Sequence, residues 1–155
     1  MSLYVIRHAH AGSRTHWDGH DPARPLSDKG RREADQIAAS LGDAGISEIW
    51  TSPFVRCVET VEPLAERCDV VVQRTDALKE GAAFADTVEL VEGLAAADIT
   101  AALCSHGDVI PDLLAALARR GTDLDPDGAC QKGSVWVLQV DGGTVTRADY
   151  AGKPG

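Results

Sequence analysis

The sequence predicts an α/β fold of three layers, with a mainly parallel central sheet, helices on both faces of the sheet, and a terminal hairpin. Short apolar segments rich in β-branched residues alternate with longer segments whose apolar residues recur at helical spacing. The last two apolar segments are separated by Gly142 and Gly143, a pair typical of a hairpin turn. The chain has 155 residues, of which 44% are hydrophobic, so we expect one domain over residues 1–155.

The first predicted strand is Leu3–Ile6, a short apolar run of the kind found in sheets that are covered on both faces. A polar segment rich in Gly and Pro follows over residues 8–26 and predicts a long loop. Loops of this length in compact domains are usually functional. Ser27 is the expected N-cap of the first helix, which should end between Gly42 and Gly45.

The second predicted strand, Ile46–Trp50, leads directly into a second helix. The residues Thr51-Ser52-Pro53 offer a capping side chain and an early proline. Val58, Val61 and Leu64 recur at helical spacing after them. Pro63 should bend or end this helix, because proline lacks the backbone N–H of a helix interior.

The remaining elements alternate in the same way as far as the hairpin. We expect a strand at Val70–Val72, a helix between Phe84 and Ala97, a strand at Ile99–Cys104, a helix at Val109–Arg119, and hairpin strands at Val135–Val140 and Thr144–Tyr150. These elements complete the predicted α/β pattern.

Charge and composition exclude several classes of protein. A formal net charge of -9 disfavours binding to nucleic acid polymers and to anionic membranes, because both require many Lys and Arg contacts. No stretch approaches the roughly 20 apolar residues of a membrane span, and the first residues do not resemble a signal peptide, so we expect a cytoplasmic protein. The four cysteines form no C-x-x-C pair, which argues against a zinc cluster.

Polar residues that can bind phosphate follow three of the predicted strands. Arg7 and His8 end the first strand, Arg56 lies in the first turn after the second, and His106 and Gly107 follow the fourth. Ligands of parallel sheets bind beyond the carboxyl ends of the strands, so these residues should converge. Arginine matches phosphate oxygens with two N–H groups, histidine is a nucleophile, and a helix N-terminus favours an anion. The pattern therefore predicts a phosphate site.

Three motifs carry a resemblance to a known family. Arg7-His8-Ala9 resembles the Arg-His-Gly signature of the histidine phosphatase superfamily, which includes the phosphoglycerate mutases. The segment Thr51–Thr60 is similar to its S-P-x-x-R-x-x-x-T motif, and Ser105-His106-Gly107 matches its second histidine motif. The stretch Arg7-His8-Ala9-His10-Ala11-Gly12, followed by Arg24-Pro25-Leu26-Ser27 and Gly30, resembles the short bacterial SixA-type branch. It also looks like the phosphatase domain fused to some actinobacterial Nudix hydrolases. Ala9 replaces the family glycine and places a methyl group near the nucleophile.

The resemblance implies a role for each of these residues. His8 would be the residue that is phosphorylated, while Arg7, Arg56 and His106 would hold the phosphoryl group. Gly107 would border the same phosphate. Glu80, after the third strand, would be the general acid, and the acidic residues that could replace it in this role are Asp18, Asp21 and Asp108.

The activity implied is that of a phosphatase that needs no metal or other cofactor. Its substrate would be a phosphorylated small molecule, a nucleotide or a phosphoprotein. The enzyme would therefore be a phosphoric monoester hydrolase. The reaction would hydrolyse a phosphomonoester or phosphohistidine through a covalent phosphohistidine intermediate.

Other functions remain open. A mutase-type phosphotransferase would use the same residues but return the phosphoryl group to a substrate hydroxyl, although the chain has little room for the insertions of such enzymes. A non-catalytic module that binds phosphate would also keep these residues. A metal-binding module would draw on the histidines and acids of the long loop, which lack regular zinc spacing: His8, His10, His16, His20, Asp18 and Asp21.

Overall fold

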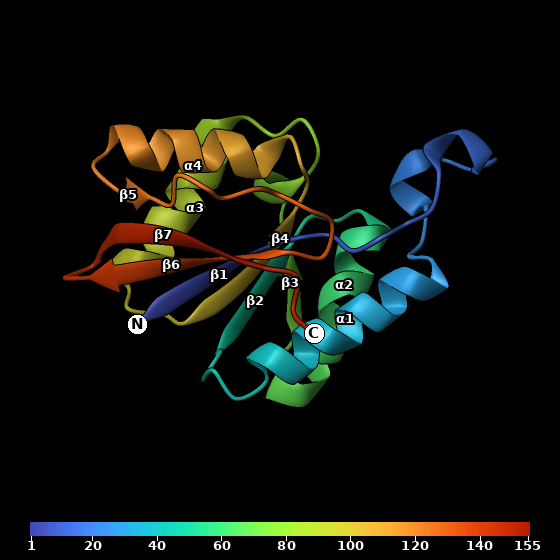
Figure 1. Cartoon of the computed structure of the whole chain (residues 1–155), viewed down its shortest axis with the longest axis horizontal. Helices are drawn as coiled ribbons and strands as arrows, with labels where there is room; N and C mark the ends of the chain where they lie inside the picture. Colours follow the sequence, from blue (N-terminus) through green and yellow to red (C-terminus); the bar gives the residue numbers. More distant parts are fainter.

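A seven-stranded sheet runs through the computed structural model, which describes residues 1–155, in the order β3-β2-β4-β1-β6-β7-β5. Its strands are β1 (Ser2–Arg7), β2 (Glu48–Thr51), β3 (Val72–Arg74), β4 (Ala101–Ser105), β5 (Asp123–Leu124), β6 (Val135–Asp141) and β7 (Thr144–Gly152). The neighbours among β3, β2, β4 and β1 pair in parallel, and the β6–β7 hairpin runs antiparallel beside β1 (Figure 1).

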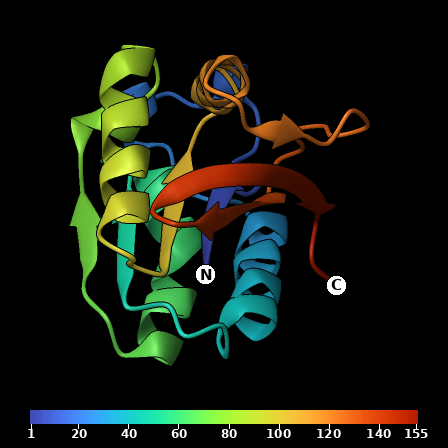
Figure 2. The ribbon, with the colours of Figure 1, turned by 90° about the vertical axis from the view of Figure 1, so that its left-hand side faces the viewer.

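Two pairs of helices cover the two faces of this sheet. The helices α1 (Asp28–Leu41) and α2 (Val55–Cys68) lie on one face, and α3 (Phe84–Ala96) and α4 (Val109–Arg119) on the other (Figures 1 and 2). The predicted three-layer α/β fold with a terminal hairpin is therefore confirmed, and so are the bounds of the helix at Val109–Arg119. None of the helices is both long enough and apolar enough to cross a membrane.

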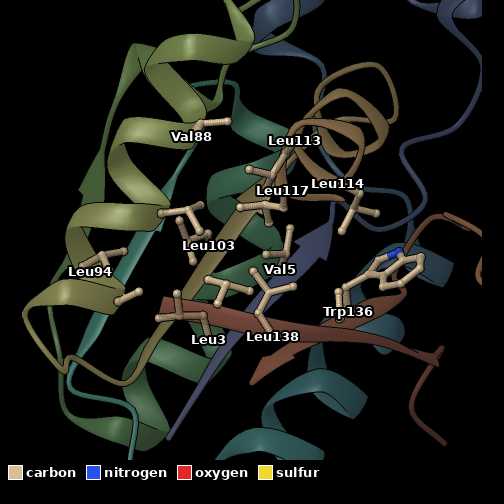
Figure 3. Close-up of a cluster of buried hydrophobic side chains, with 14 of the residues drawn as sticks. Leu3, Val5, Val88, Leu94, Leu103, Leu113, Leu114, Leu117, Trp136 and Leu138 are labelled. Carbon is tan, nitrogen blue, oxygen red and sulfur yellow. The ribbon is translucent and has the colours of Figure 1, made fainter. Parts of the chain in front are cut away.

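Side chains of the central strands alternate between two apolar cores. Leu3 and Val5 of β1 pack with residues of α3, α4 and β6, as Figure 3 shows. Ile6 of the same strand packs on the other face with residues of α1 and α2. Both faces of β1 are thus buried, because successive side chains of a strand point to opposite faces and each face here is covered by helices.

Strands β3 and β4 begin two residues later than predicted, for a shared reason. An aspartate in the left-handed conformation follows each preceding helix: Asp69, with φ 57°, comes directly after α2, and Asp98, with φ 58°, comes two residues after the last residue of α3. The next backbone N–H, of Val70 or Ile99, then donates back to a carbonyl of the helix it follows. This arrangement is a helix C-cap, so these two apolar residues belong to the caps and not to the strands.

The prediction that Pro63 ends the second helix is wrong. Helix α2 begins at Val55, two residues after Pro53, and continues through Pro63 to Cys68. Val61 and Leu64 on either side of the proline are fully buried in the core that α2 shares with α1. Burial of these side chains outweighs the one missing backbone hydrogen bond, since tertiary packing supplies most of the stability of a short helix.

The carboxyl ends of β1, β2 and β4 lie at one edge of the sheet, because Arg7 pairs with Ser105 and Thr51 with Cys104. The loop after β1 projects from this edge (Figure 1) and contains two short 3-10 helices, η1 (Arg14–His16) and η2 (Asp21–Ala23). A third, η3 (Asp76–Leu78), follows β3. The loop ends at the predicted N-cap, where the Ser27 hydroxyl accepts a hydrogen bond from the N–H of Gly30.

Candidate active site

A polar pocket of about 320 Å³ opens at this edge of the sheet, and no hydrophobic residue lines it. It brings together all of the site residues predicted from the sequence, together with several that were not. Its lining consists of Arg7, His8, Gly12, Arg14, Arg24, Arg56, Glu80, His106, Gly107, Asp108 and Lys132. Five of these residues carry a positive charge, which contrasts with the net charge of -9 for the whole chain.

His8 lies directly after β1 with its imidazole ring nearly buried. Its Nδ1 is 2.8 Å from the carbonyl oxygen of Ala9, an acceptor, so Nδ1 carries the proton in the neutral ring. Nε2 then holds the free lone pair. Burial lowers the pKa of His8 to about 3, assisted by the nearby charges of His106, Arg56 and Arg7 and opposed by the hydrogen bond to Ala9. The ring is therefore neutral at neutral pH, with a lone pair on Nε2.

Two arginines approach this ring from different elements. Arg56, in the first turn of α2, is 1% exposed, and its Nη1 donates to the carbonyl oxygen of Asp21 at 3.1 Å. Arg7 ends β1, and its Nη1 donates to the carbonyl oxygen of Cys130 at 2.6 Å. These backbone contacts fix the planes of both guanidinium groups beside His8, in a manner suited to phosphate recognition.

His106 follows β4, and its ring lies 5.3 Å from that of His8 between centroids. The hydroxyl of Ser52 is 2.8 Å from Nε2 of His106, and the ring edge also contacts Phe54. The Ser52 oxygen accepts the N–H of Phe54, so its own proton is available to donate to Nε2. In that arrangement Nδ1 of His106 carries a proton and can act as a donor.

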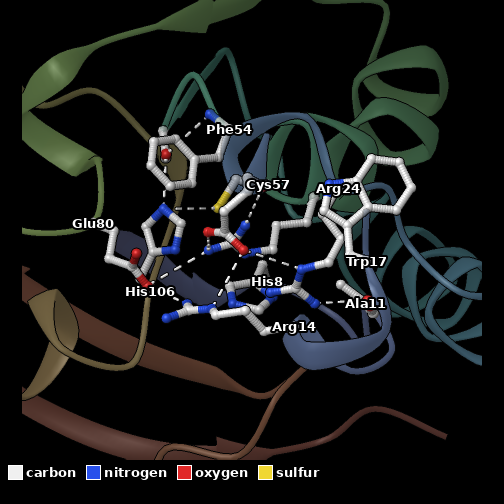
Figure 4. Close-up of polar contacts among 12 residues, drawn as sticks. His8, Ala11, Arg14, Trp17, Arg24, Phe54, Cys57, Glu80 and His106 are labelled. Atoms are coloured by element: carbon white, nitrogen blue, oxygen red, sulfur yellow. Dashed lines mark hydrogen bonds and ion pairs between the residues drawn. The ribbon is translucent and has the colours of Figure 1, made fainter. Parts of the chain in front are cut away.

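Three buried N–H donors in the site have no partner within the protein: Arg7 Nε, Arg56 Nε and His106 Nδ1. Buried donors without a partner are costly and rare in folded proteins, and an anionic oxygen would satisfy them. All three belong to residues that line the pocket with His8. Figure 4 shows His8 and His106 of this group side by side, with Glu80 and Arg14 nearby. The arrangement can hold a phosphoryl group next to the free Nε2 of His8.

Acidic residues also reach these arginines. Glu80 lies after η3, and its Oε1 is 3.0 Å from Nη2 of Arg14 and 3.5 Å from Nη2 of Arg56. Asp21 accepts from Arg14, Arg24 and Arg56. Although burial opposes its ionisation, these three guanidinium groups hold the pKa of Asp21 below its ordinary value.

The other two acids considered as proton donors have different surroundings. Asp108 lines the pocket and accepts the N–H of Gly81 at 2.8 Å, whereas Asp18 does not line the pocket. Glu80 and Asp108 thus line the pocket, and Asp21 contacts three of its arginines.

Two small residues permit the close packing of the site. A Cβ atom on Gly107 would lie 2.7 Å from Cζ of Arg7, so only glycine leaves room for that guanidinium group. Ala9, which replaces the family glycine, is fully buried in a small apolar cluster with Ala11, Leu26 and Ala34. Its N–H donates to the hydroxyl of Thr60, which in turn donates to the carbonyl oxygen of Arg56. Thr60 therefore links the two arginine segments.

The other loop histidines have separate positions. Nδ1 of His10 is 2.6 Å from the hydroxyl of Ser27, while His16 and His20 are exposed in the loop. No group of three or more His, Cys, Asp or Glu side chains is arranged to hold a metal ion.

Sequence reasoning missed several residues of the pocket. Ser52 lies in a recognised motif but was interpreted only as a helix cap. Arg14, Arg24 and Lys132 lie in loops, where no periodicity indicates the direction of a side chain.

Comparison with known proteins agrees with this site. A sequence profile of the "Histidine phosphatase superfamily (branch 1)" matches residues 3–84. The 8-oxo-(d)GTP phosphatase of Mycolicibacterium smegmatis is 33% identical over 157 residues, which is 99% of this chain and 48% of that protein. The chain thus spans about half the length of this curated relative.

Solved structures of phosphatases share the fold. The protein histidine phosphatase SixA complexed with tungstate superposes with a TM-score of 0.78 at 18% identity, covering 99% of this chain and 97% of that one. A putative SixA from Agrobacterium tumefaciens gives 0.71 at 21%, covering 89% and 90%. A mycobacterial glucosyl-3-phosphoglycerate phosphatase complexed with VO3 gives 0.75 at 20%, covering 97% of each chain.

The profile match covers the motifs around His8 and Arg56 and extends over more than half of the sequence. The SixA structures share the fold of this chain. The resemblance predicted from the three motifs is therefore confirmed, and the chain belongs to the histidine phosphatase superfamily.

Proposed function

We propose that this chain is a metal-independent phosphatase that hydrolyses a phosphomonoester or phosphohistidine through a covalent phosphohistidine at His8. One observation carries the proposal. A neutral histidine with a free Nε2 lies beside three buried N–H donors that have no partner in the protein. Nucleophilic catalysis needs an unprotonated nucleophile, and phosphoryl transfer needs donors fixed around the phosphate oxygens.

In the first step Nε2 of His8 attacks the phosphorus atom. The N–P bond forms while the bond to the leaving oxygen breaks. Arg7, Arg56 and His106 donate hydrogen bonds to the non-bridging oxygens and stabilise the charge of the transition state. The Ala9 carbonyl keeps the proton on Nδ1 and stabilises the positive charge that the ring gains when it is phosphorylated.

Glu80 supplies a proton to the leaving oxygen in this mechanism. Its carboxylate is paired with Arg14 and Arg56. A phosphoryl group bound at Arg56 competes with Glu80 for that guanidinium and leaves the carboxyl group beside the leaving oxygen. In the second step a water molecule attacks phosphorus, the N–P bond breaks, and Glu80 takes the proton of the water.

The proposed substrate is a phosphorylated small molecule, a nucleotide or a phosphoprotein. The relative named an 8-oxo-(d)GTP phosphatase favours a nucleotide, and the structures named SixA favour phosphohistidine. No hydrophobic residue lines the pocket, so the protein would recognise mainly the phosphate end of either substrate. The cytoplasmic location stays a prediction.

Rapid quench with radiolabelled substrate tests the intermediate. Wild type should carry label that is stable in base and labile in acid, His8→Gln should carry none, and the exposed-residue control His16→Gln should match wild type. Turnover by wild type without any label under single-turnover conditions would contradict the proposal.

Two further measurements separate the rival functions. Phosphate released in equal amount to dephosphorylated product indicates hydrolysis, whereas transfer to a second substrate without free phosphate indicates a mutase. Activity should survive EDTA, because arginines and histidines occupy the positions at which metal phosphatases hold cations. Loss of activity with EDTA and recovery with Mg²⁺ or Zn²⁺ would rule out the metal-free mechanism.

A further inference from the structure

Lys132 lines the pocket without an anionic partner. The pocket arginines Arg14, Arg24 and Arg56 each form an ion pair with Asp21. Lys132 makes no ion pair and no side-chain hydrogen bond, although it is partly buried and faces the same pocket. An unpaired cation among arginines is unfavourable in the free protein, because like charges repel at short range.

The backbone holds Lys132 in a defined place. It lies in the β-turn Gln131–Ser134, whose third residue, Gly133, has a φ of 76°. The N–H of Gly133 lies 3.1 Å from the carbonyl oxygens of both Arg7 and His8. The turn is thus tied to the end of β1, the strand that leads into His8. This contact holds the backbone of Lys132 beside the pocket, whereas a lysine on an unattached surface loop would have no fixed place.

The surroundings of Lys132 disfavour its charge. Burial lowers the pKa of its ammonium group, and the positive charges of Arg7, Arg24, Arg56 and Arg14 lower it further. A second anion next to the ammonium group would reverse this effect, since an opposite charge at short range favours the charged form.

The charges of the pocket side chains leave room for such an anion, if the site works as proposed above. If Glu80 is protonated as the general acid, the charged groups of the site are five cations and two carboxylates: Arg7, Arg14, Arg24, Arg56 and Lys132 against Asp21 and Asp108. Three positive charges remain. A phosphomonoester dianion neutralises two of them and leaves one.

We propose that Lys132 binds a second anionic group of the substrate, adjacent to the phosphoryl group that is transferred. The donors of Arg7, Arg56 and His106 serve the transferred group. Of the other pocket cations, Arg14 and Arg24 pair with Asp21, which leaves Lys132 without a carboxylate. The substrate class is then a phosphoryl group with a neighbouring anion, either the next phosphate of a phosphoanhydride or the carboxylate of a phosphorylated acid. This inference rests on the proposed function and adds a specificity-determining residue to it.

Binding measured by calorimetry tests the proposal without relying on turnover. The probes are inorganic phosphate, pyrophosphate and phosphonoacetate, and the variants are Lys132→Met, which keeps the aliphatic stem, and Lys132→Arg, which keeps the charge. Lys29→Met, an exposed lysine of α1, is the matched control. Pyrophosphate and phosphonoacetate each carry two anionic groups, whereas phosphate is one. Wild type and the control should bind at least one of these two-group probes more tightly than phosphate.

In Lys132→Met the affinity for that probe should fall about tenfold to hundredfold, the value of one charge-assisted contact, with a change below about threefold for phosphate. Lys132→Arg should retain most of the preference. If only the affinity for pyrophosphate falls in Lys132→Met, the substrate is a phosphoanhydride. If only the affinity for phosphonoacetate falls, the substrate is a phosphorylated acid. An equal loss for phosphate and both probes, or no preference in wild type, overturns the proposal.

Kinetics separate a failure of this inference from a failure of the proposed function. If wild type hydrolyses ethyl phosphate in a His8-dependent manner but shows no preference for a two-group probe, only the role of Lys132 is wrong. If wild type prefers the two-group probe but hydrolyses no phosphate ester or anhydride, the binding site stands and the phosphatase proposal is wrong.

Discussion

The floor and the rim of the pocket are built in different ways. The floor consists of Arg7, His8, Arg56 and His106, which follow strand ends or begin a helix, and the last three are no more than 5% exposed. The rim consists of the loop residues Arg14 and Lys132, whereas the third basic loop residue, Arg24, is 6% exposed and belongs with the buried floor. The side chain of Arg14 is 60% exposed. The sheet register fixes the floor, so its geometry should tolerate little change, whereas the rim can vary to suit different substrates.

Matched substitutions of one arginine in each region should give the largest contrast. Arg56→Lys should lower kcat/KM at least about 10³-fold, because lysine keeps the charge but loses the planar fork that meets two phosphate oxygens. Arg14→Lys should lower it by only about threefold, since solvent screens that side chain. Steady-state kinetics with thermal melts as a fold control measure both. Near wild-type kcat/KM in Arg56→Lys would remove the distinction between floor and rim.

Glu80 contacts both regions through Arg56 and Arg14, and its substitution tests how they cooperate. Glu80→Gln should slow hydrolysis of alkyl phosphates about 10²-fold, near the lower bound for general acid catalysis, because water reaches this partly exposed side chain. Aryl phosphates such as p-nitrophenyl phosphate should be spared, since their leaving group departs without a proton. Equal losses for both substrate types would assign the proton to Asp21 or Asp108.

Within the floor, Ser52 should act by fixing the proton of His106. Ser52→Ala removes the hydroxyl that lies 2.8 Å from Nε2 and leaves that nitrogen only the weaker contact with Sγ of Cys57 at 3.5 Å, so the ring can place its proton on either nitrogen. We expect a loss of kcat/KM of about tenfold, equivalent to one hydrogen bond. Nitrogen-15 NMR should show a single tautomer of His106 in wild type and a mixture in the variant. One unchanged tautomer in both proteins would count against this role.

The smallest effect concerns stability, and it also belongs to the floor. The pKa of His8 falls from about 6.5 in the unfolded chain to about 3 in the folded protein. The unfolded state therefore binds one more proton between these values, and folding stability is lost as pH falls below about 6.5. Between pH 6 and 4.5 the denaturation free energy of wild type should fall more steeply than that of His8→Gln, by about 1.4 kcal/mol per pH unit at most. Parallel slopes would mean that His8 is protonated in the folded protein.

The floor could be predicted from the sequence better than the rim, because the register of the sheet fixes the positions of the floor residues. Arg7, His8 and His106 follow apolar strands, and the carboxyl ends of parallel strands must meet at one edge. The site of Lys132 depends on a turn with a left-handed glycine and on hydrogen bonds to a strand distant in sequence, which no local pattern reveals. The catalytic roles and the single-domain organisation stay predictions.

The element types were predictable because apolar spacing differs between strands and helices, but several ends were not. Val70 and Ile99 have strand-like side chains, yet their N–H groups close helix caps. Pro63 has the local character of a helix end, but burial of its neighbours decides otherwise. In each case contacts with residues several positions away outweighed the preference of the residue itself.

The place of β1 in the sheet sets the order in which the site can be completed during protein synthesis. Leu3 pairs with Ala101 of β4, and Ser2 pairs with Gln139 of β6, so both neighbours of the nucleophile's strand come much later in the chain. Pairings so distant in sequence form slowly, and chains fold from the end that emerges first from the ribosome. We expect nascent chains that lack the hairpin to leave one edge of β1 unpaired, so that His8 gains its final surroundings only after the rest of the sheet has been translated.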